Sequence, residues 1–185
     1  MGTPFFTIGH SDRSVDDFIA LLEGAGVELV VDVRKLPGSK RHPQFNQDTL
    51  ALSLEEHGIG YRRSSGLTGR RLVSKTVPGE TNAWWQNRSF HNYADHALGD
   101  EFGEALAELR EAGRGQRLAV MCSEAVWWRC HRRIIADHLI ANGEEVFHIM
   151  GEGRVEPASL SPGAEISEDL SVRYPPEKEK GTPDE

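Results

Sequence analysis

Apolar residues occur along the chain in two alternating arrangements, which are short continuous runs and longer runs with helical spacing. Five continuous runs predict strands at residues 5–8, 27–33, 59–63, 118–121 and 145–150. Apolar side chains every three or four positions predict helices at residues 15–23, 47–57, 93–112 and 125–141. Because strands and helices alternate, we expect a three-layer α/β fold, in which a mainly parallel five-stranded sheet has helices on both faces.

The composition changes after residue 151 and divides the chain into one domain and a tail. Residues 1–151 hold all of the predicted elements and are expected to form a single α/β domain. Within it, residues 72–92 show no regular period and are expected to be an insertion or lid, and Gly99 predicts a break in the third helix. Residues 152–185 are acidic and rich in proline and glycine, so we expect a loosely ordered tail.

Charge and composition restrict the class of protein. The net charge is −8, but residues 34–75 carry nine Arg or Lys against three acidic residues, a local excess of +6. The overall acidity argues against a general polyanion binder, whereas the basic segment is either a specific phosphate or nucleic-acid site or an ordinary solvated face. The chain has no apolar run of about 18 residues, no signal-peptide pattern and only two cysteines. We therefore expect a reduced cytoplasmic protein with no membrane partner.

Polar residues follow four of the predicted strands at their carboxyl ends, whereas the opposite strand ends carry no comparable groups. In a parallel sheet all carboxyl ends lie at one edge, and ligands bind there. We therefore predict a site at this edge. The residues concerned are His10 and Ser11 after the first strand, Asp32 and Arg34 after the second, Arg70 after the third, and Cys122, Ser123 and Glu124 after the fourth.

Cys122 is the candidate nucleophile, because it lies where a strand is expected to pass into a helix. Free amide groups and the helix dipole stabilise a thiolate or a bound anion at such a position. His10 or His131 would act as its base. The alternative is that Cys122 is a small buried apolar residue. The spacing differs from the phosphatase loop, since a cysteine followed by five residues and arginine would require Arg at position 128, where Trp128 stands.

The two carboxylates near this turn have two interpretations. Glu124 and Asp32 could form an acid–base pair across neighbouring strands. Alternatively they hold Arg34 or Arg129 in place, which we favour for Asp32.

Other reactive residues have structural interpretations. Cys130, within an apolar helix pattern, is expected in the core, and so is His148 in the last strand. Cysteine spacing gives no zinc motif, so no metal is predicted. Tryptophans 84, 85, 127 and 128 either stack on a base or pack against other side chains.

Taken together, the motifs resemble a known family. They occur in the order Thr7-Ile8-Gly9-His10-Ser11, Asp32-Val33-Arg34 with Pro37 and Ser39, Gly66-Leu67-Thr68-Gly69, and Cys122-Ser123-Glu124 with Cys130-His131-Arg132. Over roughly residues 5–150 they are similar to domain-of-unknown-function family 488. The resemblance implies a compact α/β domain with the same motif residues, and it implies no particular reaction.

The combined pattern favours an enzyme that acts on a small anionic or nucleotide-like substrate, as a cysteine- or carboxylate-dependent hydrolase or transferase without a cofactor. The alternative is a nucleic-acid or nucleotide binding module without catalysis, which would use the basic segment and the tryptophans. A redox or regulatory thiol is a third possibility. The expected catalytic residues are Cys122, Glu124 and His10, and the expected substrate-binding residues are Ser11, Asp32, Arg34, Arg70, Ser123, Arg129, His131 and Arg132.

Overall fold

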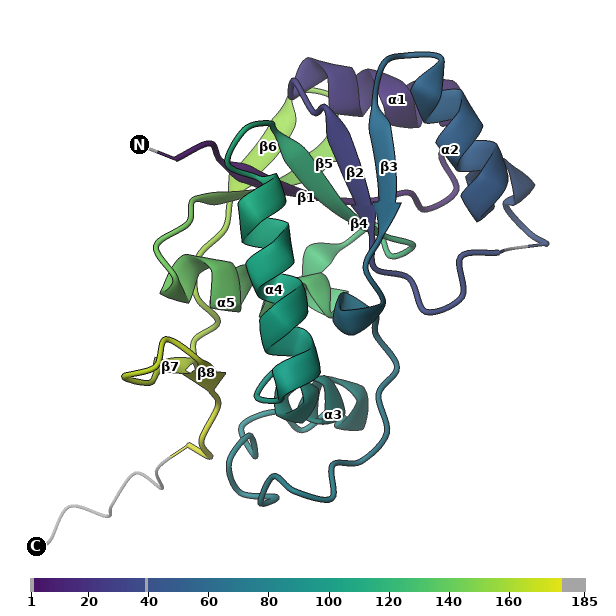
Figure 1. Cartoon of the computed structure of the whole chain (residues 1–185). Coiled ribbons are helices and arrows are strands. Elements are labelled where there is room, and N and C mark those ends of the chain that lie inside the picture. Colours follow the sequence, from purple (N-terminus) through teal and green to yellow (C-terminus); the bar gives the residue numbers. More distant parts are fainter. Residues whose placement is uncertain (1, 39, 178–185) are drawn as a thin grey trace, which may run out of the picture.

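The computed structural model describes residues 2–38 and 40–177, and a six-stranded sheet lies at its centre (Figure 1). The strand order is β3-β2-β4-β1-β5-β6. The bounds are Phe5–Gly9 for β1, Leu29–Asp32 for β2, Gly60–Arg63 for β3, Leu118–Cys122 for β4, Val146–Gly151 for β5 and Arg154–Pro157 for β6. The first five strands are parallel, as predicted, and β6 pairs antiparallel with β5. The sheet therefore has six strands rather than the expected five.

The central strands are apolar at nearly every position because helices cover both faces of the sheet. β1, β2 and β4 are buried along their whole length, as is typical of parallel strands in this kind of fold. Their register places Gly9 opposite Cys122, and Asp32 opposite Met121. The chain segments that follow β1, β2 and β4 consequently leave the sheet side by side.

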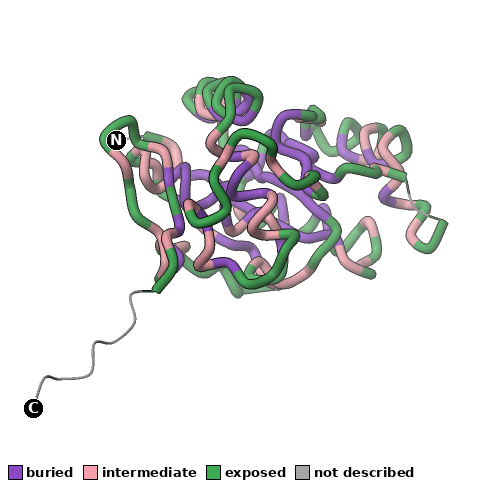
Figure 2. The backbone as a smooth tube through the Cα atoms, turned by 90° about the horizontal axis from the view of Figure 1, so that it is seen from below, coloured by how far each residue is buried: buried purple, intermediate pink, exposed green. Residues whose placement is uncertain are grey.

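Helices α1 (Val15–Gly24) and α2 (Gln47–Glu55) cover one face of the sheet (Figure 1). A first apolar core joins them to the strands, and Figure 2 shows the buried residues concentrated in the interior of the molecule. This core contains Phe18, Ile19 and Leu22 of α1, Leu50 and Leu54 of α2, and Ile8, Val30, Ala119 and Met121 of the sheet.

Helices α3 (Arg88–His96), α4 (Asp100–Ala112) and α5 (Arg132–Ala141) form the other layer and enclose the second core. The predicted break at Gly99 is confirmed, because this glycine separates α3 from α4. The expected three layers are therefore present. Within the described residues, none of the helices has the length and apolar character needed to cross a membrane.

The helix after β4 begins later than its apolar spacing predicts. We expected a helix over residues 125–141, but α5 begins at Arg132, after a loop that contains the 3-10 turn η3 (Trp127–Arg129). In this loop the ring of Trp127 stacks on the buried His148, with the ring centroids 4.6 Å apart. The loop curls around the end of β4 and returns Cys130 to the side of Cys122.

Residues 152–177 contain regular structure, whereas we expected residues 152–185 to form a loosely ordered tail. It forms β6 and a small two-stranded sheet of β7 (Glu165–Ile166) and β8 (Val172–Arg173), and it buries Tyr174. The Tyr174 hydroxyl donates to Asp137 at 2.6 Å, and the Tyr174 amide donates to Asn82 Oδ1 at 2.9 Å. Contacts with distant parts of the chain thus order a segment that has few apolar residues. Residues 178–185 lie outside the described residues.

The expected insertion at residues 72–92 extends into a helix. Residues 68–87 contain turns and bends, and residues 88–92 belong to α3. Asn82 is fully buried near the middle of the irregular part and donates to Asp95 of α3 at 2.7 Å. The segment leads directly to the amino end of α3, beside the pocket described next.

Candidate functional site

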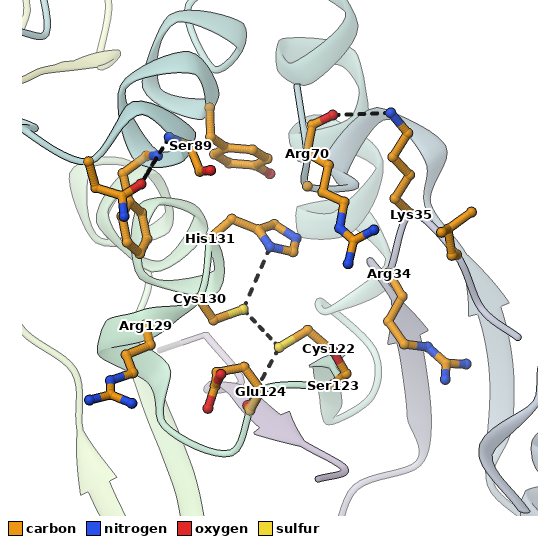
Figure 3. A pocket seen from close by; sticks show the side chains of 15 residues that line it. Arg34, Lys35, Arg70, Ser89, Cys122, Ser123, Glu124, Arg129, Cys130 and His131 are labelled. Atoms are coloured by element: carbon orange, nitrogen blue, oxygen red, sulfur yellow. Dashed lines mark hydrogen bonds between the residues drawn. The ribbon is translucent and has the colours of Figure 1, made fainter. Parts of the chain in front are cut away.

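A pocket of about 330 Å³ opens where the carboxyl ends of β2 and β4 meet (Figure 3). Four segments far apart in the sequence line it, namely the residues after β2, the loop at Gly69, the first turns of α3, and the loop between β4 and α5. The lining includes Arg34, Lys35, Gly69, Arg70, Asn87, Ser89, Phe90, Tyr93, Cys122, Ser123, Glu124, Arg129, Cys130 and His131.

Two thiols and an imidazole form a connected row in this pocket (Figure 3). The sulfur of Cys122 lies 2.8 Å from that of Cys130, and both cysteines are free. The Cys130 sulfur also lies 3.6 Å from Nδ1 of His131. Both cysteines are buried, but each lines the pocket. A small molecule in the pocket therefore has a route to the sulfur pair.

The ring of His131 is fixed with Nδ1 toward the sulfurs. Its Nε2–H donates to the carbonyl oxygen of Val33 at 3.1 Å, and its Nδ1 faces the Cys130 sulfur. Gly69 makes this ring position possible, because a Cβ at residue 69 would lie 2.8 Å from Nδ1. The ring of Tyr93 packs on the imidazole at a centroid distance of 4.9 Å.

The amino end of α5 provides further support for charge on Cys130. The first amide of the helix, that of Arg132, donates to the Cys130 sulfur at 3.4 Å. The Arg132 side chain is fully buried, and its guanidinium donates to Thr7 Oγ1 at 3.1 Å and to the carbonyl of Glu124 at 2.7 Å. A fixed positive charge therefore lies next to the sulfur pair.

These surroundings give the two thiols opposite acid–base properties. Burial and the hydrogen bond with Cys130 raise the pKa of Cys122 well above its usual value. Burial opposes ionisation of Cys130 as well, but the Cys122 thiol, His131 and Arg132 outweigh it and hold the pKa of Cys130 well below its usual value. The arrangement favours a Cys130 thiolate that accepts a hydrogen bond from a protonated Cys122.

Positive charge and hydrogen-bond donors line the pocket that contains the sulfur pair. Arg70 and Arg129 are exposed and line the pocket, and Lys35 Nζ donates to the Arg70 carbonyl at 3.1 Å. Figure 3 shows the Arg70 side chain reaching down between His131 and Arg34. The amino end of α3 also faces the pocket through Asn87 and Ser89. This lining suits an anionic ligand.

Asp32, Arg34 and His10 form a hydrogen-bonded network beside the pocket, and of these three residues Arg34 lines it. Both carboxylate oxygens of Asp32 accept hydrogen bonds from the Arg34 guanidinium, the shortest at 2.7 Å, and Tyr61 donates to Asp32 as well. Asp32 therefore contacts Arg34 in the way we favoured. The Phe45 carbonyl accepts a further bond from Arg34 at 2.8 Å, so this arginine is tightly held.

His10 is part of this network and does not line the pocket. Its Nδ1 donates to the Ser11 carbonyl at 2.8 Å, and its Nε2 accepts from Arg34 Nη1 at 3.3 Å. The ring stacks on Phe45 with centroids 4.4 Å apart. Burial lowers the pKa of His10 to about 4. The hydrogen bond to Ser11 opposes this shift, and the Arg34 charge adds to it. This neutral ring holds Arg34, and it is His131 that contacts a sulfur.

The structure brings together most of the residues that the sequence indicates, but not all of them. Among the expected site residues, the pocket is lined by Arg34, Arg70, Cys122, Ser123, Glu124, Arg129 and His131, whereas His10, Ser11, Asp32 and Arg132 lie outside its lining. Glu124 is exposed, and its carboxylate accepts a 3.4 Å bond from the Val126 amide, so Asp32 and Glu124 have separate hydrogen-bond partners. Glu124 touches the sulfur pair only through its backbone carbonyl.

Cys130 is the main residue whose position the sequence did not indicate. It lies in the core, as expected, and its sulfur also lines the pocket. The signal in the sequence was the Cys130-His131-Arg132 triplet, but its meaning depends on the loop that ends at residue 131. Lys35, Asn87 and Ser89 were also not indicated.

The remaining aromatic and histidine residues mostly pack against other side chains. His148 is buried and bonded to Thr7 Oγ1 at 2.6 Å, as a core histidine would be. Arg133 lies over the rings of Trp84, Trp85 and Trp127. Within residues 2–38 and 40–177, no three His, Cys, Asp or Glu side chains form a group suited to a metal ion.

The fold and the pocket define a three-layer α/β protein with a thiol pair at the carboxyl edge of its sheet. The chain belongs to the DUF488 family, whose model, described as a domain of unknown function, matches residues 14–139. This match confirms the resemblance carried by the sequence motifs. Neither the curated proteins nor the solved structures contain a match to the chain.

Proposed function

We propose that this protein is an enzyme that uses the thiolate of Cys130 to attack a small anionic substrate. The observation that carries the proposal is the surroundings of the Cys130 sulfur, which contacts the Cys122 sulfur, Nδ1 of His131 and the first amide of α5. Such an environment stabilises the thiolate, which is the nucleophilic form. The proposed nucleophile is thus Cys130, and Cys122 supports it as a hydrogen-bond donor.

The pocket supplies the other parts of a nucleophilic mechanism. Arg70, Arg129 and the amino end of α3 bind the anionic group and hold the substrate above the sulfur. The Cys130 sulfur forms a bond to the electrophilic atom, and the leaving group departs with the electron pair of the bond that breaks. His131 Nδ1 carries a proton to or from the reacting groups. The rings of Phe90 and Tyr93 in the lining are compatible with a nucleotide-like substrate.

The alternative of a nucleic-acid binding module has less support. Several arginines of the basic segment are engaged within the protein and are not available as a free cationic surface. Arg63 donates to the Lys35 carbonyl at 2.8 Å, and Arg71 donates to the Ser65 carbonyl at 2.8 Å. Arg34 is held by Asp32. We therefore favour the enzyme.

Alkylation by iodoacetamide, followed by peptide mass spectrometry, tests the proposal. We expect Cys130 in the wild-type protein and in Cys122→Ser to react at least about tenfold faster than a free cysteine near neutral pH. Sulfate should protect it, less so in Arg129→Gln and Arg70→Gln. Arg114→Gln is the control, because that exposed arginine pairs with Glu111 on the surface of α4 and does not line the pocket. Slow alkylation of Cys130, or preferential alkylation of Cys122, would contradict the proposal.

A further inference from the structure

We infer that Cys122 is a resolving thiol, and that the pocket carries out thiol–disulfide exchange with a low-molecular-weight disulfide that bears carboxylate groups. The inference rests on the proposed function, because it requires Cys130 to be the attacking thiolate. It adds the class of substrate and a second step, in which Cys122 and Cys130 close to a disulfide within the protein.

The contacts of the two sulfurs carry the inference. The sulfurs are 2.8 Å apart, so forming a disulfide of about 2.05 Å requires a movement of less than about 1 Å. Cys122 is the last residue of β4, and Cys130 lies near the end of the loop before α5. The residue at the end of the strand is held by the sheet, whereas the loop residue can adjust. A thiol in contact with a nucleophilic thiolate can displace a group that has become covalently bound to that sulfur.

The chemistry balances without a further oxidant. In the first step the Cys130 thiolate attacks one sulfur of the substrate disulfide, which forms a mixed disulfide and releases one substrate thiolate. In the second step Cys122 attacks the Cys130 sulfur as a thiolate and forms the Cys122–Cys130 disulfide. The bond between Cys130 and the substrate sulfur breaks, and the departing sulfur takes up the proton lost by Cys122 and leaves as the second thiol. The substrate disulfide is reduced by two electrons, and the protein dithiol is oxidised by two.

The surroundings of Cys122 change in the direction that the second step requires. The neighbouring Cys130 thiolate raises the pKa of Cys122, after the effect of burial, whereas the Arg132 charge lowers it. Once Cys130 is in a mixed disulfide, its negative charge is gone and the Arg132 guanidinium remains. Cys122 then becomes more acidic, so the resolving thiol is activated only after the first thiol has reacted.

The charge of the lining selects the substrate. Arg70 and Arg129 are exposed on the pocket walls, and Lys35 lies beside Arg70, whereas Glu124 is the one acidic residue in the lining that the structure describes. A disulfide with carboxylates is attracted to these cations, and a disulfide with ammonium groups is repelled. The volume of about 330 Å³ suits one arm of a small molecule.

The test compares oxidised glutathione, which is anionic, with cystamine, which is cationic. The full-length protein is reacted with each disulfide, quenched in acid and analysed by mass spectrometry. We expect the wild-type protein to form the Cys122–Cys130 disulfide and to release two thiols for each disulfide consumed. Oxidised glutathione should react at least about tenfold faster than cystamine at low salt, and the difference should shrink as salt rises.

Two cysteine variants separate the steps. Cys122→Ser should stop at a mixed disulfide on Cys130, and Cys130→Ser should react at least about tenfold more slowly. Circular dichroism checks that both variants are folded. If a variant does not fold, the products formed by the wild-type protein still test the inference. Fast alkylation of Cys130 together with a stable mixed disulfide in the wild type would overturn this inference and leave the proposed function intact. Equal or faster reaction with cystamine would overturn the substrate class, and an unreactive Cys130 would overturn both proposals.

Discussion

At the scale of single residues, the decisive feature is that the pKa of Cys130 is lowered whereas that of the neighbouring Cys122 is raised. The Cys130 sulfur has hydrogen-bond contacts with Cys122, His131 and the first amide of α5, whereas the Cys122 sulfur has them with the Glu124 carbonyl and Cys130. Two like thiols eight positions apart thereby acquire different acidities. Sequence patterns distinguish such residues poorly, because the difference comes from partners that are distant along the chain, such as Val33 behind His131.

Replacement of His131 tests this distribution of charge. In His131→Gln the side-chain amide can still donate to the Val33 carbonyl, but the group that faces Cys130 is lost. We expect the pH midpoint of Cys130 alkylation to rise by about one unit. His131→Asn, which keeps a polar atom toward Cys130, should show a smaller rise. The midpoints are measured as alkylation rates against pH, and an unchanged midpoint in His131→Gln would show that the imidazole does not support the thiolate.

At the scale of elements, the loop between β4 and α5 determines where the reactive groups lie. The apolar residues keep helical spacing through residues 125–131, yet this segment is not helical as a whole, because its side chains contact other parts of the protein. Trp127 stacks on His148, and Cys130 joins Cys122. The strand and the main part of the helix could be predicted from local pattern, but the turn between them could not, because its conformation depends on contacts with β1 and β5.

Because β1 lies very close to this loop, we predict how a substitution at Gly9 changes the stability of the protein. A Cβ on Gly9 would lie 1.8 Å from the Glu124 carbonyl oxygen, and backbone atoms cannot move aside cheaply. We expect Gly9→Ala to lower the free energy of unfolding by about 3 kcal/mol or more. The matched control is Gly103→Ala in α4, where a Cβ meets nothing within 4 Å and should stabilise the helix by about 0.5–1 kcal/mol.

Urea unfolding of the two variants provides the measurement. The prediction compares the same chemical change at a crowded and at an open position, so it does not depend on the absolute stability of the protein. If Gly9→Ala unfolds at the same urea concentration as the wild type, the loop does not lie against β1 as described.

At the scale of the whole molecule, the sequence predicts the layers better than the boundary of the domain. Continuous apolar runs and helical spacing were sufficient for five strands and for helices on both faces, because these patterns reflect burial directly. The segment after Gly151 has few apolar residues, and its order comes from single contacts between positions far apart, such as Tyr174 with Asn82 and Asp137. Local composition does not contain that information.

Three buried histidines predict that the folded protein is sensitive to acid. The pKa of His10 and that of His138 are lowered to about 4 and the pKa of His148 to about 3, in each case mainly by burial. Below about pH 6.5 the unfolded chain binds protons on these rings, whereas in the folded protein His10 and His138 do so only near pH 4 and His148 only near pH 3. Stability is therefore fully present above about pH 6.5 and falls as the pH decreases through this window.

The expected loss is about 2 kcal/mol for each of these histidines at about pH 5, measured as the free energy of urea unfolding against pH. His138→Met removes one titrating ring beside Phe102, where Nε2 has no hydrogen-bond partner among residues 2–38 and 40–177. The dependence of stability on pH in this variant should be shallower by about one third. A wild-type stability that stays constant between about pH 7 and pH 5 would contradict the prediction.

The two outermost strands have a consequence for self-association. Strand β3 at one margin carries Arg62 and Arg63, and strand β6 at the other carries Arg154, Glu156 and Pro157. Charged side chains and a proline on an unpaired margin disfavour docking of a further strand from another molecule. The apolar interior strands are thus shielded on both sides against edge-to-edge growth of the sheet.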